Sequence, residues 1–147
     1  MTTKIISLNQ PKILALIPAC AVIFDYVLTF LLAGSKGMVL QWEASPLVRY
    51  ALSNDLMVIY MAAIVLFYYA AAFLVLTSLK DTPVYRFGII LVFLVSITHI
   101  LGGMSWYFRS PEYSNSVMAL SYVTILVSLA ALGYAIIRKQ SGNAMRT

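Results

Sequence analysis

The chain is 147 residues long, is 62% hydrophobic and has a mean hydropathy of +0.90. Only 10% of its residues are charged, whereas a soluble domain averages about 25%, so the composition excludes an ordinary soluble protein. The formal net charge is +5, but the cations lie at the ends of apolar runs, which argues against nucleic acid as a partner. The length suits one membrane domain over residues 1–147, and a single cysteine excludes a disulfide framework.

Four apolar runs are long enough to cross a bilayer core of about 30 Å. The first run begins after Pro11, which suits a first helical position, and Pro18 is expected to kink it. Short links between the runs favour an antiparallel bundle, so we predict an all-α, polytopic membrane protein with four transmembrane helices. The expected spans are residues 13–33, 56–79, 85–107 and 116–137, with an outer loop at 34–54, polar turns at 80–83 and 109–115, and a frayed, positive tail at 138–147.

The outer loop contains several local signals. Residues 38–42 are too few to span the bilayer, and we expect them at its interface, where Trp42 fits the headgroup level. Pro46 is expected to set a turn or to open a short helix. The run Ser-Asn-Asp at 53–55 predicts the start of the second spanning helix, because each of these side chains can cap free amide groups.

Positively charged residues predict the orientation of the helices. The side that holds both termini has seven cations and the opposite side has three, so both termini are predicted to be cytoplasmic in a cell membrane. Trp42, Trp106 and Tyr107 then fall in the outer aromatic belt. The seven cations are Lys4, Lys12, Lys80, Arg86, Arg138, Lys139 and Arg146, and the three are Lys36, Arg49 and Arg109.

Two ionisable residues lie inside the spans at matching depth. Asp25 is eight residues before the end of the first span at Ala33, and His99 is eight residues before the end of the third span at Tyr107. At about 1.5 Å per residue, each lies about 12 Å below the outer edge, so we predict that the two side chains meet. Ionisable groups within a membrane are costly and by default indicate a functional site. A structural pair that joins two helices and a proton relay are the alternatives.

Small and polar side chains converge on the same depth. Thr29 shares a helix face with Asp25, and glycines share a face with His99, where they allow helices to approach closely. Ser121 and Thr124 of the fourth helix and Tyr60 of the second fall near this level. The alternative for Thr29 and for the polar residues of the fourth helix is that they only pack against neighbouring helices. The candidate ligand-binding residues are Asp25, Thr29, Glu43, Tyr60, His99, Ser121 and Thr124.

The second acid of this set, Glu43, lies in the outer loop, and a re-entrant loop would lower it toward Asp25 and His99. Asp, Glu and His together are a plausible ligand set for zinc or another divalent metal. A three-ligand site with an open position activates water. The alternative is that Glu43 is a solvated acid or an ion-pair partner of Arg49 or Arg109.

The stretch from Phe24 to Arg49 contains Asp25 and Thr29 at a spacing of four, then Gly34, and then the run Glu43-Ala44-Ser45-Pro46-Leu47. This pattern resembles that of a family of small prokaryotic membrane proteins classified as a domain of unknown function, which has Asn where Ser45 stands. The resemblance covers about 25 residues. It implies that Asp25, Thr29, Glu43 and Pro46 belong together, and it implies no activity.

These residues predict a multi-pass membrane protein with a buried polar site in its outer half, which binds a metal ion or a small polar ligand such as a lipid headgroup. Its enzymatic version is a metal-dependent membrane hydrolase, with His99 and Asp25 as ligands and Glu43 as third ligand or general base. The main alternative is a non-catalytic accessory or assembly subunit, with Asp25 and His99 as a structural pair. A channel or transporter is a further alternative, although no broken-helix pair or internal repeat is evident. Expected partners are the lipid bilayer, membrane proteins and further copies of this chain.

Overall fold

The computed structural model describes residues 10–144, and for residue 135 and residues 138–144 it describes the backbone alone. This part of the chain is helical and contains no strand. Four helices are long and apolar enough to cross a membrane, so the predicted all-α, four-helix membrane architecture is confirmed. The helices are α1 (Pro11–Leu14), α2 (Leu16–Ala33), α3 (Lys36–Trp42), α4 (Pro46–Ser53), α5 (Met57–Leu79), α6 (Tyr85–Phe108) and α7 (Pro111–Ala144).

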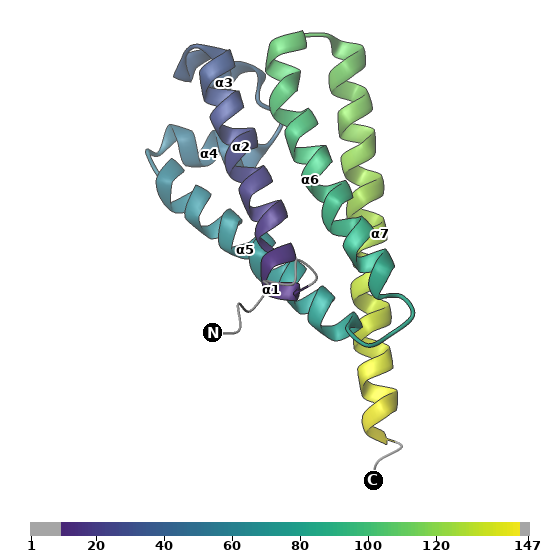
Figure 1. Ribbon diagram of the computed structural model, residues 1–147. Coiled ribbons are helices and arrows are strands. Elements are labelled where there is room, and N and C mark those ends of the chain that lie inside the picture. Colours follow the sequence, from purple (N-terminus) through teal and green to yellow (C-terminus); the bar gives the residue numbers. More distant parts are fainter. Residues whose placement is uncertain (1–9, 145–147) are drawn as a thin grey trace, which may run out of the picture.

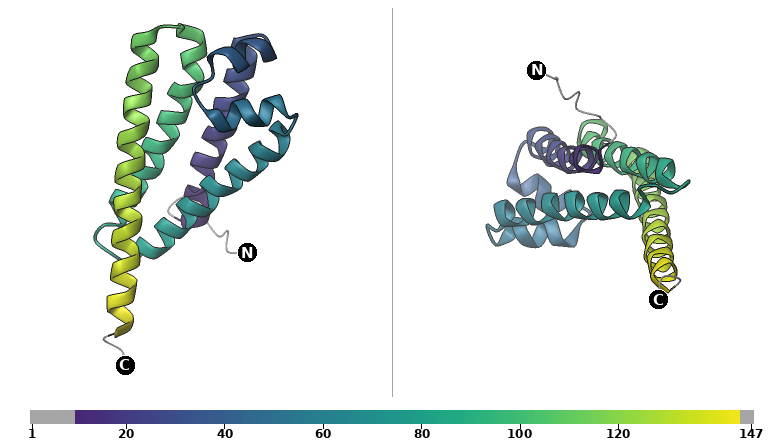
Figure 2. Two further views of the ribbon diagram at one scale, coloured as in Figure 1. Left: turned by 180° about the vertical axis from the view of Figure 1, so that it is seen from behind. Right: turned by 60° about the horizontal axis from the view of Figure 1, so that its bottom comes forward.

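The long helices form an open bundle. Figures 1 and 2 show α2, α6 and α7 side by side, with α5 crossing them at an angle. The short helices α3 and α4 lie at one end, and the start of α1 and the end of α7 lie at the other (Figure 1). Both ends of the described chain are therefore on the same side of the bundle, as four membrane crossings require.

Pro18 disturbs the first helix one turn before its own position. Helix α1 ends at Leu14, and α2 begins at Leu16. Proline has no amide hydrogen to donate four residues back, so the carbonyl of Leu14 loses its regular partner. The interruption at Ala15 follows from that loss.

The predicted outer loop contains two short helices, α3 and α4, and a serine caps the start of each. The Ser35 hydroxyl accepts a hydrogen bond from the Met38 amide at 3.2 Å, and the Ser45 hydroxyl accepts one from the Val48 amide at 3.4 Å. Serine is a favoured residue at such N-caps. Pro46 follows Ser45 as the first residue of α4, so the short helix expected after this proline is present.

The prediction that residues 53–55 start the second spanning helix is wrong. Both the backbone and side-chain amides of Asn54 donate to the Tyr50 carbonyl, at 3.2 and 2.8 Å, so Asn54 ends α4. Asp55 takes a left-handed conformation with φ of 57°. Its carboxylate pairs with Lys36 at 2.7 Å, and the hydrogen bond from Lys36 lowers the pKa of Asp55. Helix α5 then begins without a side-chain cap.

The last helix begins earlier than predicted, at Pro111 rather than residue 116. The Ser110 hydroxyl accepts a hydrogen bond from the Tyr113 amide at 3.3 Å and donates to Glu112 at 2.6 Å. A serine cap followed by proline is a strong helix start, so the expected turn at 109–115 shrinks to two residues. The backbone stays helical through Ala144, which corrects the expectation of a frayed tail from residue 138.

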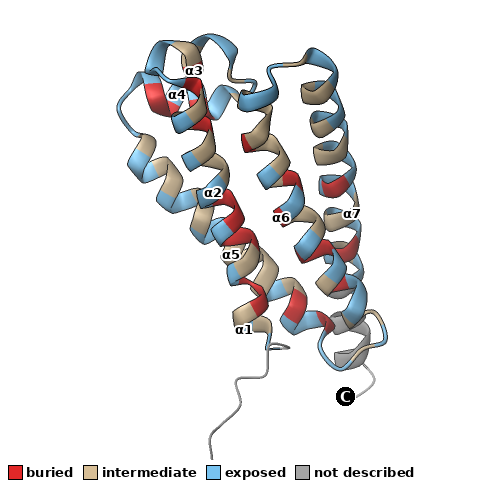
Figure 3. Cartoon of the chain, turned by 45° about the horizontal axis from the view of Figure 1, so that its top comes forward, coloured by how far each residue is buried: buried red, intermediate tan, exposed pale blue. Residues whose placement is uncertain are grey.

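Helices α2 and α6 approach each other closely at Gly103. A Cβ added at Gly103 would lie 2.9 Å from the Leu28 Cβ and 3.0 Å from the Asp25 carbonyl oxygen. Helix α2 makes its most extensive contact with α6. Figure 3 shows that buried residues follow the facing sides of the helices, while the outward faces are exposed. Those outward faces carry many large apolar side chains, as a lipid environment requires.

We expect Gly103→Ala to destabilise the bundle by about 1–3 kcal/mol, because the new methyl group would collide with the backbone of α2. The matched control is Gly102→Ala, whose Cβ would meet the nearest Asp25 atom at 3.6 Å, an ordinary van der Waals contact. The measurement is the free energy of unfolding in mixed micelles. Equal losses for the two variants would contradict the close approach at Gly103.

Candidate functional site

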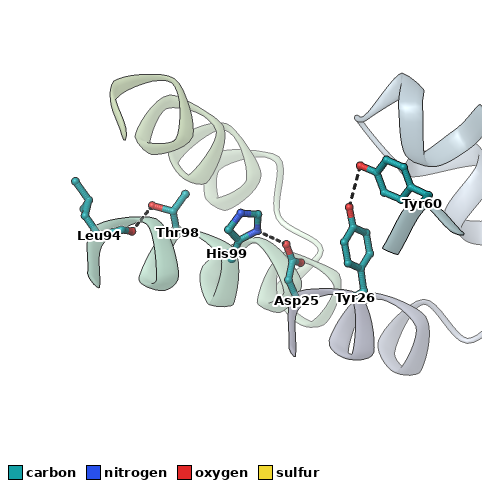
Figure 4. A network of polar contacts seen from close by, with 6 residues as sticks. All are labelled: Asp25, Tyr26, Tyr60, Leu94, Thr98 and His99. Atoms are coloured by element: carbon teal, nitrogen blue, oxygen red, sulfur yellow. Dashed lines mark hydrogen bonds and ion pairs between the residues drawn. The ribbon is translucent and has the colours of Figure 1, made fainter. Parts of the chain in front are cut away.

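Asp25 of α2 and His99 of α6 form a direct ion pair or hydrogen bond between their helices. The Asp25 Oδ2 atom lies 2.8 Å from the His99 Nδ1 atom, and Figure 4 shows the two side chains meeting between their helices. The His99 side chain is 21% exposed and the Asp25 side chain 19%. The predicted contact between Asp25 and His99 is therefore present, and both side chains are partly exposed.

Two neighbouring glycines of α6 face Asp25. Gly102 lies one helical turn beyond His99, and a Cβ added there would lie 3.6 Å from the nearest Asp25 carboxylate oxygen, an ordinary van der Waals contact. A Cβ added at Gly103 would lie only 3.0 Å from the Asp25 carbonyl oxygen. The close approach of α2 and α6 at Gly103 therefore brings the Asp25 carboxylate within reach of His99.

Three tyrosines border the Asp25–His99 pair. The Tyr68 ring of α5 meets the His99 ring edge to face, with centroids 4.7 Å apart. On the other side of Asp25, the Tyr26 hydroxyl donates to the Tyr60 hydroxyl at 3.1 Å. Tyr60 is among the residues predicted for the site, whereas Tyr26 and Tyr68 are not. The oblique path of α5 brings Tyr68 to His99, and no sequence period indicates that angle.

Glu43 lies between α3 and α4 and is half-buried. Its Oε1 atom accepts a hydrogen bond from the Ser45 amide at 2.9 Å, so its carboxylate folds back on its own segment. Burial raises the pKa of Glu43, and the negative charge of Asp25 adds to this rise, while the Ser45 and Ala44 amides and Arg49 oppose it. Glu43 is therefore an electrostatic neighbour of Asp25.

The predicted three-ligand metal centre does not assemble. Within the described residues, no group of three His, Cys, Asp or Glu side chains could hold a metal ion. Asp25 and His99 meet, but Glu43 is engaged with Ser45 rather than converging on them. The metal-dependent membrane hydrolase predicted from the sequence thus lacks its third ligand in this arrangement.

The remaining predicted residues lie in α2 and α7. Thr29 is buried in α2. The Thr124 hydroxyl lies 3.4 Å from that of Thr98 and donates to the Leu120 carbonyl at 2.8 Å, so Thr124 joins α7 to α6 beside the site rather than inside it. Ser121 is half-buried one turn away on the same helix.

Arg109 is a functional element of the fold that sequence reasoning missed. It was considered as a partner of Glu43, but its guanidinium donates to the Leu32 carbonyl at 3.0 Å and to the Trp106 carbonyl at 3.2 Å. Carbonyls at a helix end have no partner within the helix. One side chain therefore satisfies a carbonyl at the end of each of α2 and α6, about two helical turns beyond the Asp25–His99 pair.

Four long apolar helices with an intramembrane Asp–His pair define a membrane-embedded, multi-pass protein. Comparison with protein-family models, with curated proteins and with solved structures gave no significant match to this chain. The resemblance of residues 24–49 to a family of small membrane proteins therefore stays a prediction. The cytoplasmic location of the termini and the location in the cell membrane also stay predictions.

The raised pKa of Glu43 predicts a pH-dependent stability. The folded protein holds this proton more tightly than the unfolded chain, so stability falls as pH rises from the ordinary value of 4.5 toward the raised one. We expect the wild type to lose melting temperature relative to Glu43→Gln across this window and to run parallel to it outside. The measurement is thermal unfolding in detergent from about pH 4 to about pH 8. A difference that is constant, or that grows with pH in favour of the wild type, would contradict the burial of this carboxyl.

Proposed function

We propose that this protein binds a small polar ligand, such as a lipid headgroup, at the Asp25–His99 pair. The pair lies in the half of the bundle nearest α3 and α4, which the charge distribution predicts to be the outer half. Glu43, Tyr60 and Tyr68 border the bound ligand in this proposal.

The observation that carries the proposal is that Asp25 occupies only one of the two ring nitrogens of His99. Its Nδ1 atom is engaged by Asp25 at 2.8 Å, and among the described residues no hydrogen bond is recorded for its Nε2 atom. A carboxylate at one nitrogen fixes the tautomer and makes the other nitrogen a better acceptor or base. The His99 side chain is 21% exposed, so the ring is not sealed from a ligand.

The chemistry around the ring favours a ligand that donates hydrogen bonds. Two carboxylates, Asp25 and Glu43, lie within electrostatic range of each other. The hydroxyls of Tyr26 and Tyr60 add further acceptors. No described cation contacts the pair, because Arg109 is engaged with helix-end carbonyls. An amine or a hydroxyl group suits this site better than a phosphate.

Phosphatidylethanolamine tests this proposal, because its ammonium group donates hydrogen bonds while the quaternary ammonium of phosphatidylcholine does not. We expect native mass spectrometry of the full chain in detergent to show preferential retention of the ethanolamine lipid. His99→Asn keeps a nitrogen near the position of Nδ1 and removes Nε2. It should lower that retention about tenfold, as expected for one hydrogen bond to an oriented acceptor, without lowering the melting temperature.

Thr98→Val is the matched control. It removes the buried polar contact of Thr98, the residue before His99 in α6, with Thr124, and it preserves side-chain shape. This variant should retain the ethanolamine lipid as the wild type does. Equal retention of the two lipids by the wild type, or full retention by His99→Asn, would contradict ligand binding through Nε2.

The contact between Asp25 and His99 joins α2 directly to α6. It therefore favours a second candidate, a non-catalytic accessory or assembly subunit in which this pair is structural. Interhelical hydrogen bonds in membrane proteins contribute about 0.6–2 kcal/mol each. In that case Asp25→Ala lowers the free energy of unfolding by about this amount, while His99→Asn changes neither stability nor lipid retention. The same unfolding and mass measurements therefore separate the two candidates.

A further inference from the structure

A hollow lies at the opposite end of the bundle from Asp25 and His99. It has a volume of about 550 Å³ and is lined by the turn between α5 and α6, at residues Lys80, Asp81, Thr82, Pro83, Tyr85 and Arg86. This turn closes the end of the bundle where the described chain begins and ends (Figure 1). None of these residues belongs to the site proposed above.

The two cations of this hollow have no acidic partner within the described residues. Lys80 and Arg86 are exposed and form no recorded ion pair, although Asp81 lines the same hollow. The Thr82 hydroxyl is engaged with the Leu79 carbonyl at 2.6 Å and stabilises the turn. The hollow thus presents an excess of positive charge from a fixed turn.

An apolar groove adjoins the same turn. It has a volume of about 310 Å³, and Leu79 and Val84 from the turn form part of its wall. Phe87 of α6 and Ala130 and Tyr134 of α7 extend it along the helices. Residues that line the groove are direct neighbours in sequence of residues that line the hollow: Leu79 precedes Lys80, and Val84 precedes Tyr85. The two features therefore lie side by side.

We propose that the cationic hollow and the apolar groove together bind one anionic phospholipid, with its phosphate at Lys80 and Arg86 and an acyl chain in the groove. Basic pockets between transmembrane helices on the cytoplasmic side bind anionic headgroups, and the charge distribution predicts this turn to be cytoplasmic. Apart from the hydroxyl of Tyr134, the side chains that line the groove are apolar, as an acyl chain requires. This site is independent of the one proposed at His99, which favours a hydrogen-bond donor rather than an anion.

The test compares phosphatidylglycerol with phosphatidylcholine of the same acyl chains, bound to the full chain in detergent and read by native mass spectrometry. We expect the wild type to prefer phosphatidylglycerol. Lys80→Gln and Arg86→Gln should each lower its retention about fivefold, the effect of one surface cation on an anionic lipid. Both positions are exposed, so the variants are expected to fold.

Two controls distinguish a built site from general attraction. Arg49→Gln removes an exposed cation from α4, at the other end of the bundle, and should leave phosphatidylglycerol retention unchanged. Ala130→Phe fills the groove without altering charge and should weaken retention of the whole lipid. An equal loss in Arg49→Gln, or no preference for phosphatidylglycerol in the wild type, would overturn the proposal.

Inorganic phosphate separates a lipid site from an anion site. In excess it should compete only weakly, because it gains nothing from the groove. If it displaces the lipid fully and Ala130→Phe has no effect, the hollow binds a free anion and the lipid proposal fails. Phosphatidylethanolamine retention through His99 should not change in Lys80→Gln or Arg86→Gln, so failure at one site leaves the other independently tested.

Discussion

The close contact between α2 and α6 is the constraint on which the other features depend. At Gly103 the backbones are so close that a methyl group has no space, and this fixes the separation at which Asp25 reaches His99. The same contact brings the end of α2 within reach of Arg109, which binds the Leu32 carbonyl. In a membrane, where the surroundings are as apolar as the helix surfaces, such close packing and polar contacts are what drive helices together.

Two groups of polar side chains of different charge lie at opposite ends of the bundle. Asp25, Glu43 and tyrosine hydroxyls lie near α3 and α4, whereas Lys80 and Arg86 outnumber Asp81 in the hollow at the other end. An acid inside hydrocarbon is stabilised only by a close partner, and His99 supplies that partner. Lys80 and Arg86 lie at helix ends, where they need none.

The two corrected helix starts share one cause, which is competition between local hydrogen bonds. Asn54 is a good N-cap in principle, but both of its amides bind the Tyr50 carbonyl of the preceding helix. Ser110 was read as part of a turn, although with Pro111 it starts α7 five residues early. Polar residues between two helices can end the first or begin the second, and sequence spacing does not decide which.

The sequence by itself determined the four apolar helices, their order and the matching depth of Asp25 and His99, because length and periodicity follow directly from bilayer thickness and helical rise. It did not determine that Tyr68 packs on His99, that Glu43 turns back to Ser45, or that Arg109 joins two helix ends. These contacts depend on the angle at which α5 crosses the bundle and on the paths of α3 and α4. Such angles result from side-chain packing between distant segments, which only the tertiary structure decides.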